Sequence, residues 1–222
     1  MFPPSKQPIK HREHKKFFMI YGAMRSGTQW LAHALRDNID AEYVNVTHEG
    51  WRPDRIPRVD KLWRDGPPGA YVSVGQGGYA AWRFIQKTYK PTTAFLWREE
   101  LAHARSILSH RTSEKTGIPF LCRLFLTFAA YEAVLAACAQ DKTPHTHWHL
   151  DQYTLPVGLR KMCATIKLPL KNKLVLPPPI NNTPADGARS ITGTEDCVEG
   201  IYAMFPRCRA ARRSAALRLE TT

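Results

Sequence analysis

A strand-loop-helix pattern at residues 17–36, FFMIYGAMRSGTQWLAHALR, constrains the fold of this chain more than any other feature. Residues 17–21 are apolar or aromatic and have the length of a buried parallel strand. A loop with two glycines follows, and apolar residues then recur every three or four positions, which predicts a helix. Such a loop directs backbone N–H groups and the positive end of the helix dipole at one point. The pattern therefore predicts a phosphate-binding loop.

The loop differs at one position from the loop of nucleotide triphosphatases. Gly22 and Gly27 keep the spacing of the two P-loop glycines, but Thr28 stands where those enzymes need a lysine. The nearest cation is Arg25, inside the loop. A P-loop kinase or nucleotide hydrolase is an alternative that this difference disfavours. The lack of a clear acidic magnesium ligand after an apolar strand argues against it as well.

The loop resembles the sulfonucleotide-binding loop of sulfotransferases that use 3′-phosphoadenylyl sulfate (PAPS). In that family the loop reads Lys/Arg-Ser-Gly-Thr-Thr/Ser-x-Leu directly after the first strand. The resemblance implies that the loop binds the 5′-phosphosulfate of the donor through Arg25, Ser26, Gly27, Thr28, Gln29 and Trp30. It also implies that Arg25 contacts the bridging oxygen and stabilises the charge that develops there. Gln29 replaces a hydroxyl residue of the family, and backbone contacts do not depend on that side chain.

A second match to the same family lies at the end of a later predicted strand, residues 93–97. Sulfotransferases end this strand with an arginine, and a serine follows eight positions later on the next helix. Arg98 and Ser106 keep that spacing, with the helix predicted at residues 99–110. The resemblance implies that they bind the 3′-phosphate of PAPS. A late basic loop closes over this phosphate in related enzymes, and Arg189 is the candidate here.

A general base must take the proton of the acceptor, and in this family the base is a histidine or a glutamate. A predicted strand at residues 42–47 leads into His48 and Glu49, at the edge where parallel sheets bind ligands. Bacterial relatives often carry a glutamate at such a position, so Glu49 ranks first and His48 second. Adjacent residues of an extended segment point in opposite directions, so we expect one of the two to face the donor.

The whole pattern predicts an α/β fold, a three-layer P-loop-type parallel sheet flanked by helices in a single domain. Further strands are expected at residues 71–74 and 143–150, and helices at 79–89, 156–166 and 195–205. The apolar segment 118–140 contains Arg123 and Glu132 and is predicted to be a buried core helix. Residues 51–69 are predicted to form a long loop, and residues 207–218 a solvated helix or a frayed tail.

The chain is divided into three parts by composition. Residues 1–16 are predicted to be a basic flexible tail, and residues 17–170 a sulfotransferase-like core. Residues 171–222 are predicted to add a loop, an amphipathic helix and a basic tail.

The formal net charge of +13 over 222 residues suits an anionic ligand. A non-catalytic basic protein that binds phosphate or nucleic acid is therefore a second alternative, although no arginine–aromatic interleaving typical of RNA-binding motifs is present. Five cysteines without a CxxC pair favour a reducing compartment. No N-terminal apolar segment has the length of a signal peptide or anchor, so the sequence predicts a cytoplasmic protein without a transmembrane segment.

These observations predict a PAPS-dependent sulfotransferase. It would move a sulfuryl group from PAPS to an acceptor hydroxyl or amine by in-line transfer, release 3′,5′-ADP and require no metal. His145, His147 and His149 alternate along one predicted strand, but no carboxylate or cysteine completes a metal site. The sequence leaves open whether the acceptor is a small molecule, a lipid or a carbohydrate, and leaves the oligomeric state open too.

Overall fold

A computed structural model describes residues 8–23, 25–75, 78–108, 120–150, 156–178 and 195–220 of the chain. Its elements are, in order, η1 (Arg12–His14), β1 (Lys15–Gly22), α1 (Thr28–Asn38), β2 (Val44–His48), α2 (Ile56–Asp65), β3 (Gly69–Gly75), α3 (Tyr79–Tyr89), β4 (Thr92–Trp97), α4 (Glu100–Leu108), α6 (Phe120–Gln140), β5 (His145–His149), α8 (Pro156–Thr165), α9 (Glu195–Ala203) and α10 (Pro206–Glu220).

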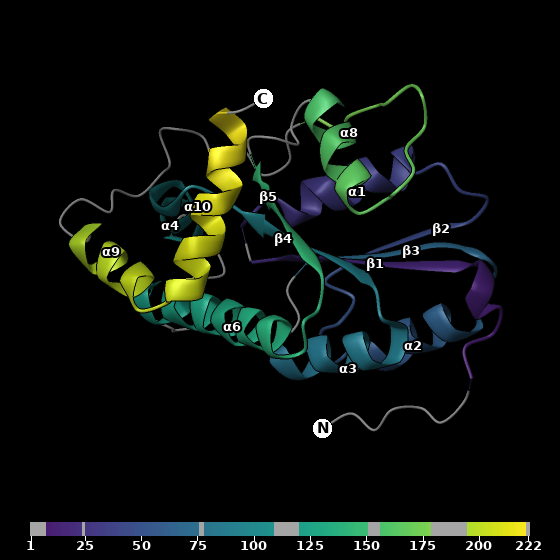
Figure 1. The fold of residues 1–222 in the computed structure, drawn as a ribbon, viewed down its shortest axis with the longest axis horizontal. Helices are drawn as coiled ribbons and strands as arrows, with labels where there is room; N and C mark the ends of the chain where they lie inside the picture. The colour runs from purple at the N-terminus through teal and green to yellow at the C-terminus, as the bar shows by residue number, and fades with distance from the viewer. Residues whose placement is uncertain are drawn as a thin grey trace.

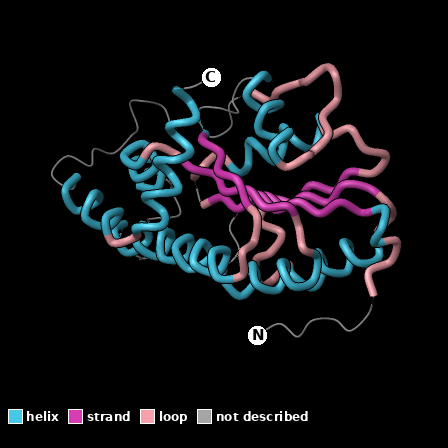
Figure 2. The backbone as a smooth tube through the Cα atoms, in the orientation of Figure 1, coloured by secondary structure: helices cyan, strands magenta, loops and turns pink. Residues whose placement is uncertain are grey.

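The centre of the molecule is a five-stranded sheet with the order β2-β3-β1-β4-β5 (Figure 1). Every neighbouring pair of strands is parallel, so the carboxyl ends of all five strands lie at one edge. Helices α1 and α8 cover one face of the sheet, and α2, α3 and α6 cover the other, which gives the three layers visible in Figure 2. The predicted α/β fold class is confirmed.

Strand β1 is buried on both faces, which explains its continuous apolar run. Phe18 and Ile20 belong to the core layer beneath α1 and α8. Phe17, Met19 and Tyr21 belong to the opposite layer. Because successive side chains of a strand alternate between faces, one apolar run supplies both layers.

Helix α2 corrects the prediction that residues 51–69 form a loop. Its buried residues Ile56, Val59 and Trp63 recur at spacings of three and four, and a proline stands in its first turn, where the missing N–H does no harm. Trp63 packs against Phe17 with ring centroids 5.4 Å apart. The high Pro, Arg and Asp content of this segment obscured a short amphipathic helix whose stability comes from packing.

Of the two forms that the sequence predicted for residues 207–218, a solvated helix or a frayed tail, the structure has a helix, α10, and one side of it packs against α6 and β5. Cys208 and Ala215 are buried in the core. An ion pair joins Arg212 Nη2 to Glu100 Oε1 at 2.5 Å, and a second joins Arg207 Nη1 to Glu132 Oε1 at 3.1 Å. Because two of its arginines form ion pairs and Cys208 and Ala215 face the core, this basic helix can pack against the edge strand β5.

Among the described helices, one segment, Leu121–Gln140 of α6, is long and apolar enough to cross a membrane by length and composition alone. In the structure α6 packs against α3, α4, α9 and α10. Tyr131, Val134 and Cys138 are among its buried residues. This is the packing expected of the core helix that the sequence predicts.

Candidate functional site

The loop between β1 and α1 is closely folded because glycine occupies two of its positions. Gly27 caps α1 with a left-handed φ of 80°, a conformation that glycine adopts without strain. A Cβ atom on Gly22 would clash with the side-chain methyl of Thr28, so only glycine lets the helix begin this close to the strand. The buried Ser26 donates from both its hydroxyl (2.7 Å) and its N–H (3.1 Å) to the Ala23 carbonyl.

The N-terminus of α1 is open toward this loop. No side chain makes a capping hydrogen bond there in the described part of the chain. The first N–H groups of any helix lack intrahelical acceptors, and they carry the positive end of the helix dipole. An anion held by the loop would accept hydrogen bonds from such groups.

Arg25 and Arg98, which belong to the two separate motifs, are brought together. Arg25 Nε donates to Ser106 Oγ in α4 at 3.1 Å, and Arg98 Nη1 donates to the Arg25 carbonyl at 3.0 Å. Arg98 lies just beyond the carboxyl end of β4, beside the end of β1. Each segment therefore donates one hydrogen bond to the other, Arg25 of the loop to Ser106 of α4 and Arg98, after β4, to the loop backbone.

Arg25 and Arg98 also share one electrostatic environment. Burial lowers the pKa of Arg25 from its usual value, and the positive charge of Arg98 lowers it further. Among the described residues, neither guanidinium forms an ion pair with a carboxylate. Arginine stays protonated in proteins, so two positive charges meet here next to a helix N-terminus. An anionic ligand would relieve their mutual repulsion.

Tyr131 of α6 forms hydrogen bonds that hold the start of the loop in place, and no sequence pattern identified it. Its buried hydroxyl accepts a hydrogen bond from Ala23 N at 2.5 Å and donates to the Leu96 carbonyl at 3.0 Å. One phenol therefore joins the first residues of the loop to the end of β4. A tyrosine within an apolar helix gives no sequence signal of such a role, because Ala23 and Tyr131 are 108 positions apart.

His48 and Glu49 lie at the carboxyl end of β2, and His48 contacts the first residue of α1, next to the loop. His48 Nε2 lies 3.1 Å from Thr28 Oγ1, within hydrogen-bond distance. Glu49 has a left-handed φ of 51°, so the alternation expected of an extended segment does not apply to it. Its carboxylate is 3.7 Å from Arg52 Nη1, and its N–H donates to the Val74 carbonyl.

The surroundings of His48 favour a neutral imidazole. Burial lowers the pKa of His48 most, and the neighbouring carboxylate of Glu49 opposes this by raising it. Three positive or titratable side chains lower the pKa further, namely His33, Arg55 and Arg36. A neutral imidazole has one nitrogen lone pair that can accept a proton.

The remaining predicted residues lie around the loop. Gln29 is exposed, and the half-buried Trp30 donates from its indole Nε1 to the Pro177 carbonyl at 3.1 Å. A segment leading to Pro177 is held over α1 by the buried Asn38, which exchanges side-chain hydrogen bonds with the backbone of Val175 at 2.7 Å. Arg189 lies outside the described residues.

Two of the three alternating histidines contact groups other than a metal ligand set. His147 Nδ1 accepts a hydrogen bond from Trp97 Nε1 at 3.0 Å, and His145 Nδ1 lies 2.8 Å from the Thr143 carbonyl. Across the residues that the structure describes, no three His, Cys, Asp or Glu side chains are placed to hold a metal ion.

No protein-family model matches the chain, and no curated protein is similar enough in sequence to match it. Among solved structures, the chain is similar to the mouse sulfotransferase SULT7A1, determined in complex with PAP. The two share 12% sequence identity with a TM-score of 0.59, over 93% of this chain and 89% of the mouse chain. At this identity the similarity shows a sulfotransferase-like fold.

Proposed function

We propose that this protein is a sulfotransferase that takes its sulfuryl group from PAPS. The observation that carries the proposal is the meeting of Arg25 and Arg98 beside the open N-terminus of α1, without a described carboxylate to neutralise them. The fold supports it, because the similar mouse sulfotransferase was determined with PAP, which is 3′,5′-ADP. Kinases and nucleotide hydrolases fit less well, since Thr28 replaces the P-loop lysine.

Two arginines from separate segments, Arg25 and Arg98, suit a ligand that carries more than one anionic group. In the proposal, the loop N–H groups and Arg25 bind the 5′-phosphosulfate, and Arg98 and Ser106 bind the 3′-phosphate. Arg25 uses one nitrogen for Ser106 and Arg98 uses one for the loop carbonyl, so other guanidinium N–H groups of each remain for a ligand. Charge-assisted hydrogen bonds of this kind are among the strongest that a protein makes.

Sulfuryl transfer, like phosphoryl transfer, depends mostly on positioning and on stabilising charge in the transition state. Arg25 would stabilise the negative charge that develops on the leaving oxygen, and the N–H groups of the loop would assist it. The acceptor proton must go to a base. We favour His48 for this role, because it contacts Thr28 at the start of α1 and its environment favours the neutral imidazole. Glu49 forms an ion pair with Arg52, and its carboxylate would raise the pKa of His48.

Binding of 3′,5′-ADP tests the proposal directly. A ligand that binds only the folded state raises the melting temperature by mass action. We expect 3′,5′-ADP to raise it, EDTA to leave the shift unchanged, and Arg25→Ala to abolish most of the shift. A shift with ATP that needs magnesium would indicate a kinase or hydrolase instead. A shift only with an oligonucleotide at low salt would indicate a basic nucleic-acid-binding protein.

A further inference from the structure

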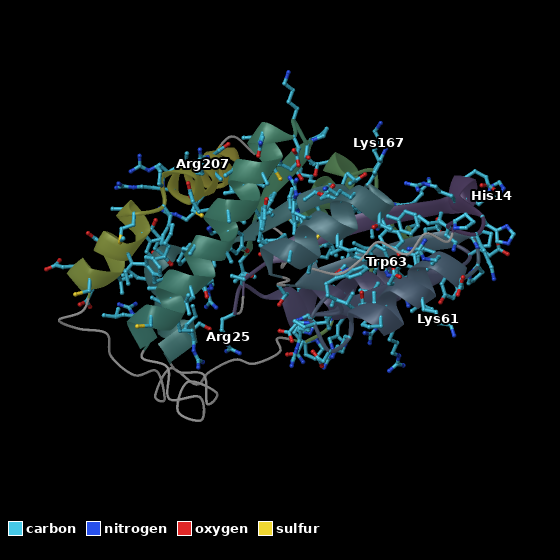
Figure 3. The ribbon with its side chains drawn as sticks, turned by 90° about the horizontal axis from the view of Figure 1, so that it is seen from below. His14, Arg25, Lys61, Trp63, Lys167 and Arg207 are labelled. Atoms are coloured by element: carbon cyan, nitrogen blue, oxygen red, sulfur yellow. The ribbon has the colours of Figure 1, made fainter. Side chains whose placement is uncertain are left out.

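A second cationic site lies at the opposite edge of the sheet from the glycine loop. A cavity of about 610 Å³ opens where β1 and β4 begin, between the ends of α3 and α8. Strand β1 spans eight residues from this edge to the loop, so the two sites are separated by about 25 Å along the strand. Figure 3 labels Lys167, at the cavity, and Arg25, in the loop, well apart.

Positive side chains dominate the cavity wall. Its lining includes five cationic residues and no aspartate or glutamate: Arg12, Lys15, Lys16, Lys90 and Lys167. Lys15 is used by the fold itself, because its buried Nζ donates to the carbonyls of Trp63 at 3.1 Å and Arg64 at 2.9 Å. The other four are exposed, and none pairs with a carboxylate of the described residues.

The backbone places three of these four side chains, those of Lys16, Lys90 and Lys167, around one space. Lys16 lies on the same face of β1 as Phe18, which packs in the core layer that contains Ile166, the neighbour of Lys167. Lys90 and Lys167 have left-handed φ angles of 52° and 55° at the ends of α3 and α8. Thr92 and Thr165 also line the cavity.

We propose that this cavity binds a small polyanion that carries at least two phosphate or sulfate groups. Its volume falls in the range of small-molecule sites, and a single monovalent anion would leave most of the four positive charges unpaired. Buried aromatic and aliphatic residues, Phe17, Phe18, Tyr89 and Ile166, line its inner part and suit the uncharged portion of such a ligand. The site does not depend on the proposed donor site, since no residue is shared.

Titration calorimetry with inorganic pyrophosphate tests this, at one low ionic strength and with EDTA present. The variant Lys90→Asn/Lys167→Asn removes two charges, and asparagine tolerates a left-handed backbone, so the fold should persist. We expect pyrophosphate affinity to fall about tenfold or more in this variant, because each charge-assisted contact contributes strongly.

Two controls make the result specific. Lys142→Asn changes another exposed lysine with a left-handed φ of 49°, just before β5, that does not line the cavity. Arg25→Ala removes the loop cation, and with it any pyrophosphate bound at the proposed donor site. Lys142→Asn should bind pyrophosphate like the unmodified protein, and Arg25→Ala should keep the binding that depends on Lys90 and Lys167. The proposal is overturned if the unmodified protein fails to bind millimolar pyrophosphate, if Lys142→Asn weakens binding as much as the double variant, or if Arg25→Ala abolishes all binding. That last result would assign the binding to the loop.

Discussion

At the carboxyl ends of the strands Arg25 and Arg98 are held by hydrogen bonds within the protein, whereas at the amino ends every cation of the cavity except Lys15 is exposed. Arg25 is half-buried and hydrogen-bonded to Ser106, and Arg98 is fixed on the loop backbone. Lys16, Lys90 and Lys167 are exposed and make no ion pair with a described carboxylate.

The difference concerns how each edge could recognise an anion. Side chains already fixed by hydrogen bonds lose little conformational freedom on binding, so they favour one ligand geometry. Exposed lysines keep that freedom until the ligand arrives, and salt screens them more strongly. We therefore expect the carboxyl edge to discriminate between nucleotides that differ by one phosphate, and the amino edge to respond mainly to total charge and ionic strength.

The largest effect is expected at the base. His48→Asn should lower turnover about 10²- to 10⁴-fold with PAPS and the true acceptor, because the acceptor proton then has no receiver in the transition state. Binding of 3′,5′-ADP, measured by calorimetry, should stay nearly unchanged, since a base acts on the acceptor. Lys142→Asn, at the amino edge, should have normal turnover. A larger loss in Glu49→Gln than in His48→Asn would make Glu49 the base, as the sequence ranked it.

The next largest effect tests whether the carboxyl edge distinguishes nucleotides with a 3′-phosphate from those without one. Arg98→Ala should weaken 3′,5′-ADP by roughly tenfold or more, since a hydrogen bond to a charged group contributes about 1.5–3 kcal/mol. Binding of 5′-AMP, which lacks the 3′-phosphate, should change little. Calorimetry with both nucleotides measures the ratio. Equal weakening of the two would show that Arg98 acts through the loop carbonyl it already contacts.

A smaller effect is expected at Tyr131, where its role in holding the loop can be distinguished from its contribution to the free energy of unfolding. Tyr131→Phe leaves Ala23 N without its hydroxyl partner, and Tyr202→Phe removes a comparable hydrogen bond to the Glu100 carbonyl at 3.0 Å. Each should lower the free energy of unfolding in urea by about 1–3 kcal/mol. Only Tyr131→Phe should also weaken 3′,5′-ADP, because only that hydroxyl holds the loop. Equal nucleotide affinity in the two variants would contradict this role.

The smallest effect concerns pH. The pKa of His48 in the folded protein lies below the usual value of 6.5. The unfolded chain therefore binds a proton at His48 more readily than the folded protein does, so stability should decrease as pH falls through 6.5. Above pH 6.5 the imidazole is neutral in the folded and the unfolded chain, so His48 adds no pH dependence to the free energy of unfolding. Urea unfolding at about pH 8 and about pH 5.5 should show less pH dependence in His48→Asn than in Lys142→Asn. Identical dependence in both would mean that His48 is not held neutral.

The sequence alone determined the features that depend on neighbouring residues. The apolar run of β1, the two glycines and the helical periodicity of α1 lie within residues 17–36, and the structure forms the predicted strand, loop and helix there. The spacing of Arg98 and Ser106 was also local, because it places one at a strand end and the other on the following helix. For α2, composition hid a periodicity that was present.

Tertiary structure decided which of these local pieces meet. Strand β1 lies between β3 and β4, and this order brings the loop beside Arg98, although they are 73 positions apart. The contacts of Tyr131 with Ala23 and of His48 with Thr28 likewise depend on how distant elements pack. So does the amino-edge cavity, whose lysines come from β1 and from the turns after α3 and α8. No local pattern encodes these meetings, because burial of apolar surface across the whole sheet selects the strand order and register.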